Sequence, residues 1–341
     1  MAELDARKQQ VLKAVVDDYT VTAIPVGSQS LAARYFARWS AATIRNELAA
    51  LMESGHLEQP HTSAGRIPSN RGYRYFVDFL MRAEPVDGDV ERQLRGQFRD
   101  VPLDLEAILE TTAMTLARAV DNVGVVSAPR TVESRLKHVD LVHLEGRRVL
   151  ALMVLEGNVV RQQPVELDSE VGQEGLTALA GRLNAEGRGM TAAELTGLAT
   201  KPGWQSWEGA IALALAELME ALDAQSATVI IHDGLRNLVR QPEFVDPERL
   251  LPVLELLEES RELARVLEAA PASEGVEFVI GDENADEHLR GCSLVLATYT
   301  AARARGTLGT IGPTRMRYAQ VVARIGLIAE LASASIGRLY E

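Results

Sequence analysis

Apolar side chains at the start of the chain recur with the spacing of short helices, and turn residues separate the runs. Over 4–19 (LDARKQQVLKAVVDDY) the apolar positions fall on one helix face, and Pro25 and Gly27 then interrupt the pattern. A second helix is predicted over 28–36 (SQSLAARYF) and a third over 41–54 (AATIRNELAALMES), with only a short connection between them. This order of a short helix, a tight turn and a second helix is typical of a helix-turn-helix motif.

The third predicted helix has two faces of different chemistry. Ser40 can cap its first turn, and Gly55 follows its last turn, where a left-handed residue commonly ends a helix. One face carries an apolar stripe, made by Ile44, Leu48, Leu51 and Met52. Thr43, Arg45 and Asn46 lie on or beside the other face, and their natural partners are a thymine methyl group, a guanine and an adenine. We therefore expect this face to read bases in a major groove, although an alanine-rich outer face is also simply a good helix former.

The stretch after this helix, HLEQPHTSAGRIPSNRGYRY over 56–75, is basic and rich in turn residues. It carries three arginines and two histidines but a single acid, Glu58. Its ends are predicted to be extended and its centre to turn, which describes a two-stranded ribbon with a basic tip. Next to a recognition helix such a ribbon is a wing that contacts DNA phosphates or the minor groove, although the loop alone would also fit a solvated hairpin. The residues expected to hold the DNA backbone are Ser40, His61, Ser63, Arg66, Arg71 and Arg74.

Beyond residue 82 the pattern alternates between helices and strands. A linker is predicted over 83–102 and a helix over 103–120, followed by strand patterns that continue to residue 166. Residues 167–224 have helical spacing, and strand and helix patterns return over 225–341. The pattern predicts a mixed α+β domain with a mainly helical middle.

Charge is divided unevenly along the chain. The 341 residues carry 35 Lys and Arg against 48 Asp and Glu, a net charge of −13. Residues 1–82 hold ten basic and eight acidic side chains, a net charge of +2, so the remainder carries −15. A basic end on an acidic body favours a polyanionic partner for the first domain alone.

The remaining chemistry excludes several classes of protein. One cysteine, Cys292, rules out an internal disulfide framework and a cysteine-rich metal site, and it is expected to be a small buried residue. No apolar run approaches the roughly 20 residues of a membrane span, and the polar start is not a signal peptide, so we expect a cytoplasmic protein. GTLGTIG, over 306–312, lacks the context of a dinucleotide-binding loop and is interpreted as a tight hairpin. No catalytic constellation or metal motif appears, so we expect no enzyme and no cofactor.

Several motifs together resemble one known family. VDDYTVTAIPVGSQSLA, SAATIRNELAALMESGHLEQPHTSAGRIPS and NRGYRYFVD are similar to the N-terminal domain of the heat-inducible transcription repressors, the HrcA family. GTLGTIGPTRMRYAQVV, over 306–322, is a second match, and the resemblance between the two is diffuse. The resemblance implies a winged helix-turn-helix domain over 1–82, a linker over 83–102, a GAF-like sheet domain over 103–166 and 225–341, and an inserted dimerisation domain over 167–224.

The family resemblance implies a sequence-specific repressor of heat-shock operons. Such a repressor would bind an inverted-repeat operator upstream of chaperone operons as a homodimer, with half-sites that mirror its two-fold axis. The resemblance also implies a chaperonin that keeps the repressor competent, release from double-stranded DNA on heating, and no membrane partner. Two alternatives stay open: a winged-helix regulator whose GAF-like domain senses a small molecule and, more remotely, an enzyme with an appended winged helix.

Overall fold

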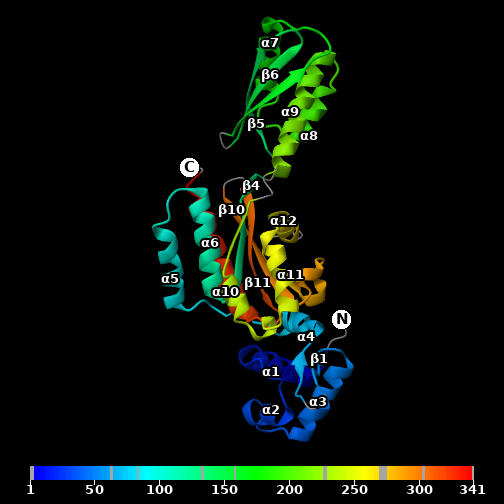
Figure 1. The fold of residues 1–341 in the computed structure, drawn as a ribbon, viewed down its shortest axis with the longest axis vertical. Coiled ribbons are helices and arrows are strands. Elements are labelled where there is room, and N and C mark those ends of the chain that lie inside the picture. The colour runs from blue at the N-terminus through cyan, green and yellow to red at the C-terminus, as the bar shows by residue number, and fades with distance from the viewer. Residues whose placement is uncertain are drawn as a thin grey trace. The chain divides into compact units, whose positions relative to one another are not determined.

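The molecule consists of two compact units (Figure 1). The computed structural model describes residues 4–61, 64–82, 84–131, 134–156, 159–225, 229–268, 275–301 and 304–339. The first unit is assembled from three segments of the chain, Met1–Ser127, Val229–Tyr299 and Gly306–Leu339. Most of the second unit comes from one segment, Ala128–Thr228, which is therefore inserted into the chain of the first.

The N-terminal part of the first unit, residues 4–82 and here called the head, begins with three helices followed by a short ribbon. Its elements are α1 (Ala6–Thr22), α2 (Ser28–Arg34), α3 (Ala41–Glu53), β1 (Leu57–Glu58), β2 (Ile67–Pro68), α4 (Asn70–Tyr75) and a π-helical turn (Phe76–Leu80). The apolar faces of the first three helices contribute to a buried core that includes Val11, Leu12, Val15, Leu31, Ile44 and Leu51. The three helices predicted from apolar spacing are confirmed, because each has one face to bury against the others.

The ribbon after α3 is antiparallel and is anchored to the helices. β1 pairs with β2, with Leu57 opposite Pro68. A further antiparallel bridge joins Val26, in the connection between α1 and α2, to Arg66, and each amide donates to the other's carbonyl over 2.8 Å. The predicted ribbon is confirmed, and this bridge ties its second strand to the helical core.

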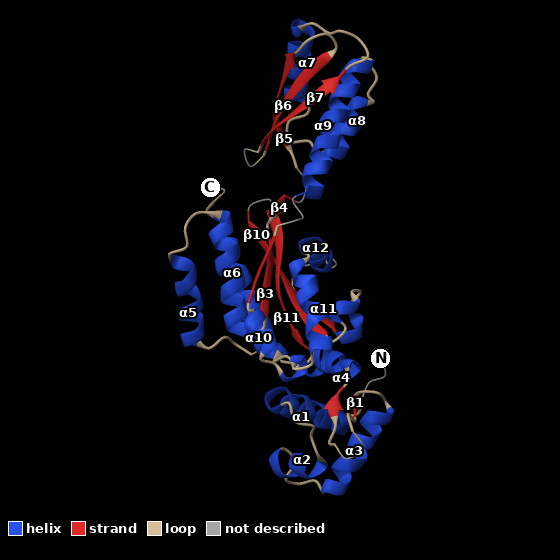
Figure 2. Ribbon diagram, viewed as in Figure 1, coloured by secondary structure: helices blue, strands red, loops and turns tan. Residues whose placement is uncertain are grey.

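The rest of the first unit, here called the sheet body, is a sheet with helices on both faces (Figure 2). The strands run in the order β8-β3-β11-β10-β9, and β4 pairs with β11. Their bounds are β3 (Val123–Ser127), β4 (Arg130–Thr131), β8 (Ile230–Asp233), β9 (Val276–Ile280), β10 (Cys292–Ala301) and β11 (Ala304–Pro313). The helices are α5 (Gly88–Arg99), α6 (Leu105–Val120), α10 (Leu235–Val239), α11 (Pro247–Glu258), α12 (Ser260–Glu268) and α13 (Tyr318–Gly337). Leucines of α11 and α12 share one buried cluster with Val123 and Val125 of β3, while α6 packs on β3 and α13.

The segment 83–102, predicted as a linker, contains a helix instead. α5 begins after Asp87, whose carboxylate accepts a hydrogen bond from the amide of Asp89. It buries Leu94 and Phe98 and packs against α6 and α13. The expectation of a linker is corrected: α5 has so narrow an apolar stripe among charged residues that its sequence resembles a solvated connection.

GTLGTIG, interpreted as a tight hairpin, lies in a central strand instead. β11 pairs within the sheet between β3 and β10, with Leu308 opposite Val126. A Cβ atom added to Gly309 would lie 2.7 Å from the carbonyl oxygen of Val295, and one added to Gly306 would overlap the ring of Tyr299. These glycines therefore permit close packing of neighbouring groups on a strand rather than a turn.

The second unit combines a three-stranded antiparallel sheet with three helices. Its elements are β5 (Leu136–His143), β6 (Arg148–Leu155), β7 (Val160–Glu166), α7 (Gln173–Glu186), α8 (Ala192–Ala199) and α9 (Ser206–Gln225). One buried cluster joins the sheet to the helices, and it includes Leu141, Met153, Leu179, Ile211 and Leu215. The expected boundary at residue 167 is therefore corrected: the strands over 136–166 pack with the helices of the insertion, which is α+β and not mainly helical.

α13 is the one helix in the described part of the chain that is long and apolar enough to cross a membrane by length and composition. It packs on α6 and α5, and its buried side chains include Tyr318, Val321, Ile325 and Ile328. Its apolar character is explained by its place in the core of the sheet body.

Candidate nucleic-acid interface

α3 begins and ends with well-formed caps. Ser40 Oγ accepts a hydrogen bond from the amide of Thr43 over 3.0 Å and lies 2.9 Å from Thr43 Oγ1. Gly55 has a φ angle of +75°, and the amides of Gly55 and His56 donate to carbonyls of the last helical turn. Both predicted caps are confirmed, and they satisfy backbone groups that a helix end leaves open. Capping at both ends therefore stabilises α3, the helix that bears the exposed side chains.

The side chains expected to read bases lie together on the outer face of α3. Ile44 and Leu48 are buried on the inner face, whereas Arg45 and Asn46 are exposed and Thr43 is half-buried. Arg45 and Asn46 make no side-chain hydrogen bond or ion pair with any residue that the structure describes. Their donors and acceptors are consequently free for an external partner.

The turn between α2 and α3 is stabilised by packing and by one ion pair. Arg34 at the end of α2 pairs with Asp18 of α1, whose carboxylate also lies 3.4 Å from the hydroxyl of Tyr35. The rings of Phe36 and Trp39 stack, with centroids 4.6 Å apart and planes 6° from parallel. The ion pair thus ties the end of α2 to α1, and the stacked rings pack within the turn that leads to α3.

The residues expected in the wing have different environments. His61 is exposed, and its carbonyl accepts the amide of Ala64 over 2.8 Å. Arg66 is half-buried, and its Nη1 donates to the carbonyl of Ala64 over 3.3 Å. Ser63 lies outside the described residues. Arg71, in the first turn of α4, is exposed and forms no hydrogen bond or ion pair within the described part of the chain.

Arg74 differs from the other expected backbone contacts, because its guanidinium is already occupied. Nε donates to Glu283 Oε1 over 2.7 Å, and Nη2 also contacts Glu283. Nη2 donates to the carbonyl of Phe278 over 2.7 Å, and Nη1 lies 3.3 Å from Asp78 Oδ1. The hydrogen bond to Glu283 raises the pKa of Arg74. The structure therefore places Arg74 where the head meets β9 and the turn after it.

A second arginine at this contact was not expected from the sequence. Arg315 follows β11 and donates from Nη1 to the carbonyl of Thr20 in α1 over 2.8 Å. Its Nε donates to Glu243 over 2.7 Å, and Nη2 donates to Gln241 over 2.9 Å. The only signal was its position in the motif GTLGTIGPTRMRYAQVV, which suggested importance without a role.

Aromatic packing and one amide complete the contact between the head and the sheet body, here called the joint. Tyr73 of α4 is 1% exposed, and its ring centroid lies 5.9 Å from that of Tyr318. Phe278 of β9 lies 6.0 Å from the same ring. Asn70 donates to Asp282 over 2.9 Å. The joint thus combines buried rings with hydrogen-bonded charges, which together hold α1 and α4 against the sheet body.

The histidine that follows α3 is close enough to Arg71 of α4 to be affected by its charge. His56 is 1% exposed, and its Nδ1 lies 2.9 Å from Ser54 Oγ. Burial lowers its pKa below the ordinary value, and the positive charge of Arg71 lowers the pKa further. His56 is therefore neutral at physiological pH and serves as a packed residue of the head.

Other chemistry in the described residues is structural. Among them no group of three or more His, Cys, Asp or Glu is placed to hold a metal ion. Cys292 is buried as expected, and burial raises the pKa of its thiol to about 12.

Comparisons with known proteins agree on one family. The model of the HrcA protein C-terminal domain matches residues 106–322. Three similar proteins bear the name heat-inducible transcription repressor HrcA. That of Pelotomaculum thermopropionicum is 35% identical, covering 99% of this chain and 98% of that protein. Those of Herpetosiphon aurantiacus and Symbiobacterium thermophilum are each 36% identical over 99% of this chain, covering 97% and 100% of those proteins.

A solved structure shares the fold over the same length. It is a crystal structure described only as that of a hypothetical protein, 22% identical, with a TM-score of 0.61 and coverage of 99% of this chain and 100% of that one. At this identity the likeness concerns the fold alone. On the family model and the relatives together, the chain belongs to the HrcA family of heat-inducible transcription repressors.

Proposed function

We propose that the head is a winged helix-turn-helix domain that binds double-stranded DNA, with α3 in the major groove and the ribbon beside the backbone. The observation that carries this proposal is the outer face of α3, where Arg45 and Asn46 are exposed and have no partner among the described residues. An arginine and an asparagine so placed can each form bidentate hydrogen bonds to a base edge. Because the inner face is buried, the helix can present only this side to DNA.

The residues expected to contact the DNA backbone fall into two groups, according to whether the side chain already has partners within the protein. Arg71 is free to neutralise a phosphate, and we keep Ser40, His61, Ser63 and Arg66 as proposed backbone contacts. Arg74 is satisfied by acids and a carbonyl of the joint, so we assign it to holding the head rather than DNA. Backbone contacts would fix the register of α3 without reading sequence.

A homodimer on an inverted repeat is proposed for the assembly. Helices that read a major groove commonly act in pairs, and half-sites then follow the two-fold axis of the protein. We place the dimer contact on the second unit, which exposes apolar side chains at Val142, Val160 and Leu213. Molar mass by light scattering tests this, since a monomer at working concentrations would refute it.

The relatives' shared name, heat-inducible transcription repressor, supports the biological role that we propose. We propose a cytoplasmic repressor of chaperone operons that is released from its operator on heating and kept competent by a chaperonin. The GAF-like label for the sheet body remains part of this proposal, as does the dimer. Binding over a promoter would repress transcription by excluding the polymerase.

The deciding experiment is fluorescence anisotropy with the purified full-length chain. One duplex carries the inverted repeat upstream of the organism's chaperonin operon, and a scrambled duplex of the same composition is the control. Specific binding should favour the repeat by a factor of about 10³ or more and should be lost after a brief heating step. Equal, salt-sensitive binding of both duplexes, with and without added chaperonin, would refute sequence-specific repression.

A further inference from the structure

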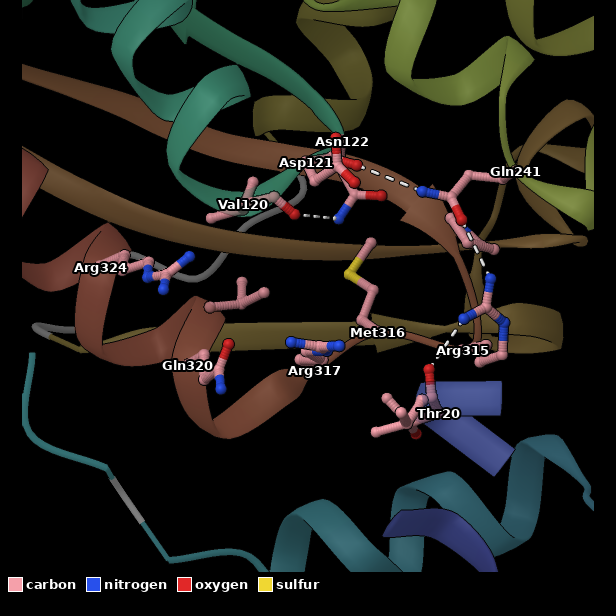
Figure 3. A pocket seen from close by; sticks show the side chains of 13 residues that line it. Thr20, Val120, Asp121, Asn122, Gln241, Arg315, Met316, Arg317, Gln320 and Arg324 are labelled. Atoms are coloured by element: carbon pink, nitrogen blue, oxygen red, sulfur yellow. Dashed lines mark hydrogen bonds between the residues drawn. The ribbon is translucent and has the colours of Figure 1, made fainter. Parts of the chain in front are cut away.

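A polar cavity of about 250 Å³ lies in the first unit, where the end of α1 faces the start of α13 (Figure 3). Its wall combines Thr20 of α1, the turn after α6 and the first turns of α13. Three arginines line it, Arg315, Arg317 and Arg324. All belong to one short stretch, TRMRYAQVVAR over 314–324, most of which lies in a motif that the proposed DNA contacts leave unexplained.

The hydrogen-bond acceptors of the wall are largely occupied. The carbonyl of Ala119 accepts a hydrogen bond from Arg324 Nη1, and the carbonyl of Asp121 accepts one from Gln241 Nε2 over 3.3 Å. Figure 3 shows Arg324 on one side of the cavity and Gln241 and Arg315 on the other, with Met316 between them. The carbonyls at the end of α6 therefore leave few acceptors facing the cavity.

Donors are in surplus. The guanidinium of Arg317 and the amide of Gln320 form no hydrogen bond or ion pair with any described residue. Arg324 uses a single nitrogen on Ala119. Thr20 contributes its carbonyl to this wall as the acceptor for Arg315 Nη1.

The side chains that line the cavity carry a net positive charge. Arg315 is balanced by Glu243, at 2.7 Å. Asp121 then carries the one carboxylate among the thirteen lining residues, which also include Arg317 and Arg324. The start of α13 adds the partial positive charge of a helix N-terminus. The cavity is thus suited to an anion.

We propose that this cavity binds a small dianion of the phosphate type, either free or as the end of a phosphate ester. Phosphate offers several acceptor oxygens to arginine forks converging from different directions, whereas chloride offers none with that geometry. The volume is below the roughly 300–1,000 Å³ of pockets for drug-sized ligands, so the anionic group itself must be the part recognised. Binding does not depend on the DNA-binding role proposed above.

The test is isothermal titration calorimetry of the full-length chain with inorganic phosphate at constant ionic strength, with sodium chloride as the replacement salt. Arg317→Gln should weaken phosphate binding by about tenfold or more, since it removes charge-assisted hydrogen bonds. Arg317 has no internal partner to lose, so this variant should fold normally. The matched control is Arg261→Gln on α12, an exposed arginine that also lacks a partner among the described residues and lies outside the cavity lining.

A second variant should have the opposite effect. Asp121 has a left-handed backbone with φ of +54°, a conformation that asparagine tolerates well. Asp121→Asn removes the repelling charge and should tighten phosphate binding severalfold. A merely structural role of these residues predicts no such gain.

The outcomes separate clearly. Binding that weakens in Arg317→Gln, tightens in Asp121→Asn and persists in Arg261→Gln supports the site. No heat of phosphate binding to the unmodified chain, or equal binding by all variants, overturns it. A loss of operator affinity with a shallower salt dependence in Arg317→Gln, without any phosphate binding by the unmodified chain, would assign these arginines to DNA instead.

Discussion

Two exposed arginines of the head, Arg45 on α3 and Arg71 on α4, differ from the two arginines of the joint in what their guanidinium groups contact. Arg45 and Arg71 are exposed and unpaired among the described residues, whereas Arg74 and Arg315 each bind a carboxylate and a backbone carbonyl. An arginine whose donors are already satisfied would have to give up an ion pair to bind DNA. The difference teaches that a basic segment should be divided by what each guanidinium already contacts, not by its charge.

The largest expected effect comes from breaking the joint at Arg315. Its side chain is 11% exposed and that of Glu243 is 20% exposed, so Arg315→Ala would leave a largely buried carboxylate without its partner. We expect a loss of about 3 kcal/mol in the free energy of unfolding, measured by urea denaturation. Arg261→Ala, at an exposed and unpaired arginine, is the control and should change stability by less than about 0.5 kcal/mol. An equal change in both variants would show that the joint contributes no special stability.

Arg45→Ala should leave folding unchanged and weaken operator binding. The loss of a bidentate base contact is expected to cost about 1–3 kcal/mol and to relax specificity at one base pair. Anisotropy with a set of single-substitution operators measures both effects. If every operator loses affinity alike, Arg45 contacts phosphate and the assignment of base reading to it fails.

Arg71→Ala tests whether an exposed arginine and an arginine of the joint differ in their contribution to the salt dependence of DNA binding. If Arg71 contacts one phosphate, the slope of log affinity against log salt should become shallower by about one unit for all sequences. Arg74→Ala, three residues further along the same basic stretch, should instead lower stability and leave this slope unchanged, because its guanidinium binds Glu283. Matching slopes for the two variants would contradict the division between them.

The smallest expected effect concerns pH. His56 has a lowered pKa in the folded state, first through burial and then through Arg71, so the unfolded chain binds more protons as the pH falls. The stability that this histidine supports is present above its unfolded pKa of about 6.5 and is lost as the pH falls below that value toward the folded pKa. Arg71→Ala should raise the folded pKa and reduce this loss, which NMR titration of His56 and melting curves at several pH values would detect. An unchanged pKa in the variant would show that the two residues are not coupled.

Hydrophobic periodicity predicts strands in this protein but does not predict which strands share a sheet. Strand patterns over 136–166 are correct as strands, but they pair in a sheet of their own with α7, α8 and α9 behind them. The same pattern would suit either sheet, because alternation reports one buried face and not the element that covers it. The prediction of a hairpin at GTLGTIG was wrong for a related reason. Glycine occurs both in turns and where two groups pack closely, and here the closeness of Val295 and Tyr299 shows that it serves close packing.

The sequence by itself determined the local features of this protein: the three helices of the head, the caps at Ser40 and Gly55, and an outer face bearing Arg45 and Asn46. These depend on residues a few positions apart, whose spacing along a helix is set by backbone geometry. Only the tertiary structure decided which strands share a sheet, that Arg74 and Arg315 belong to the joint, and that Arg317 and Arg324 line one cavity. The ion pairs of the joint join residues 72 and 209 positions apart, Arg315 with Glu243 and Arg74 with Glu283, so their meeting is a property of chain packing that no local pattern records.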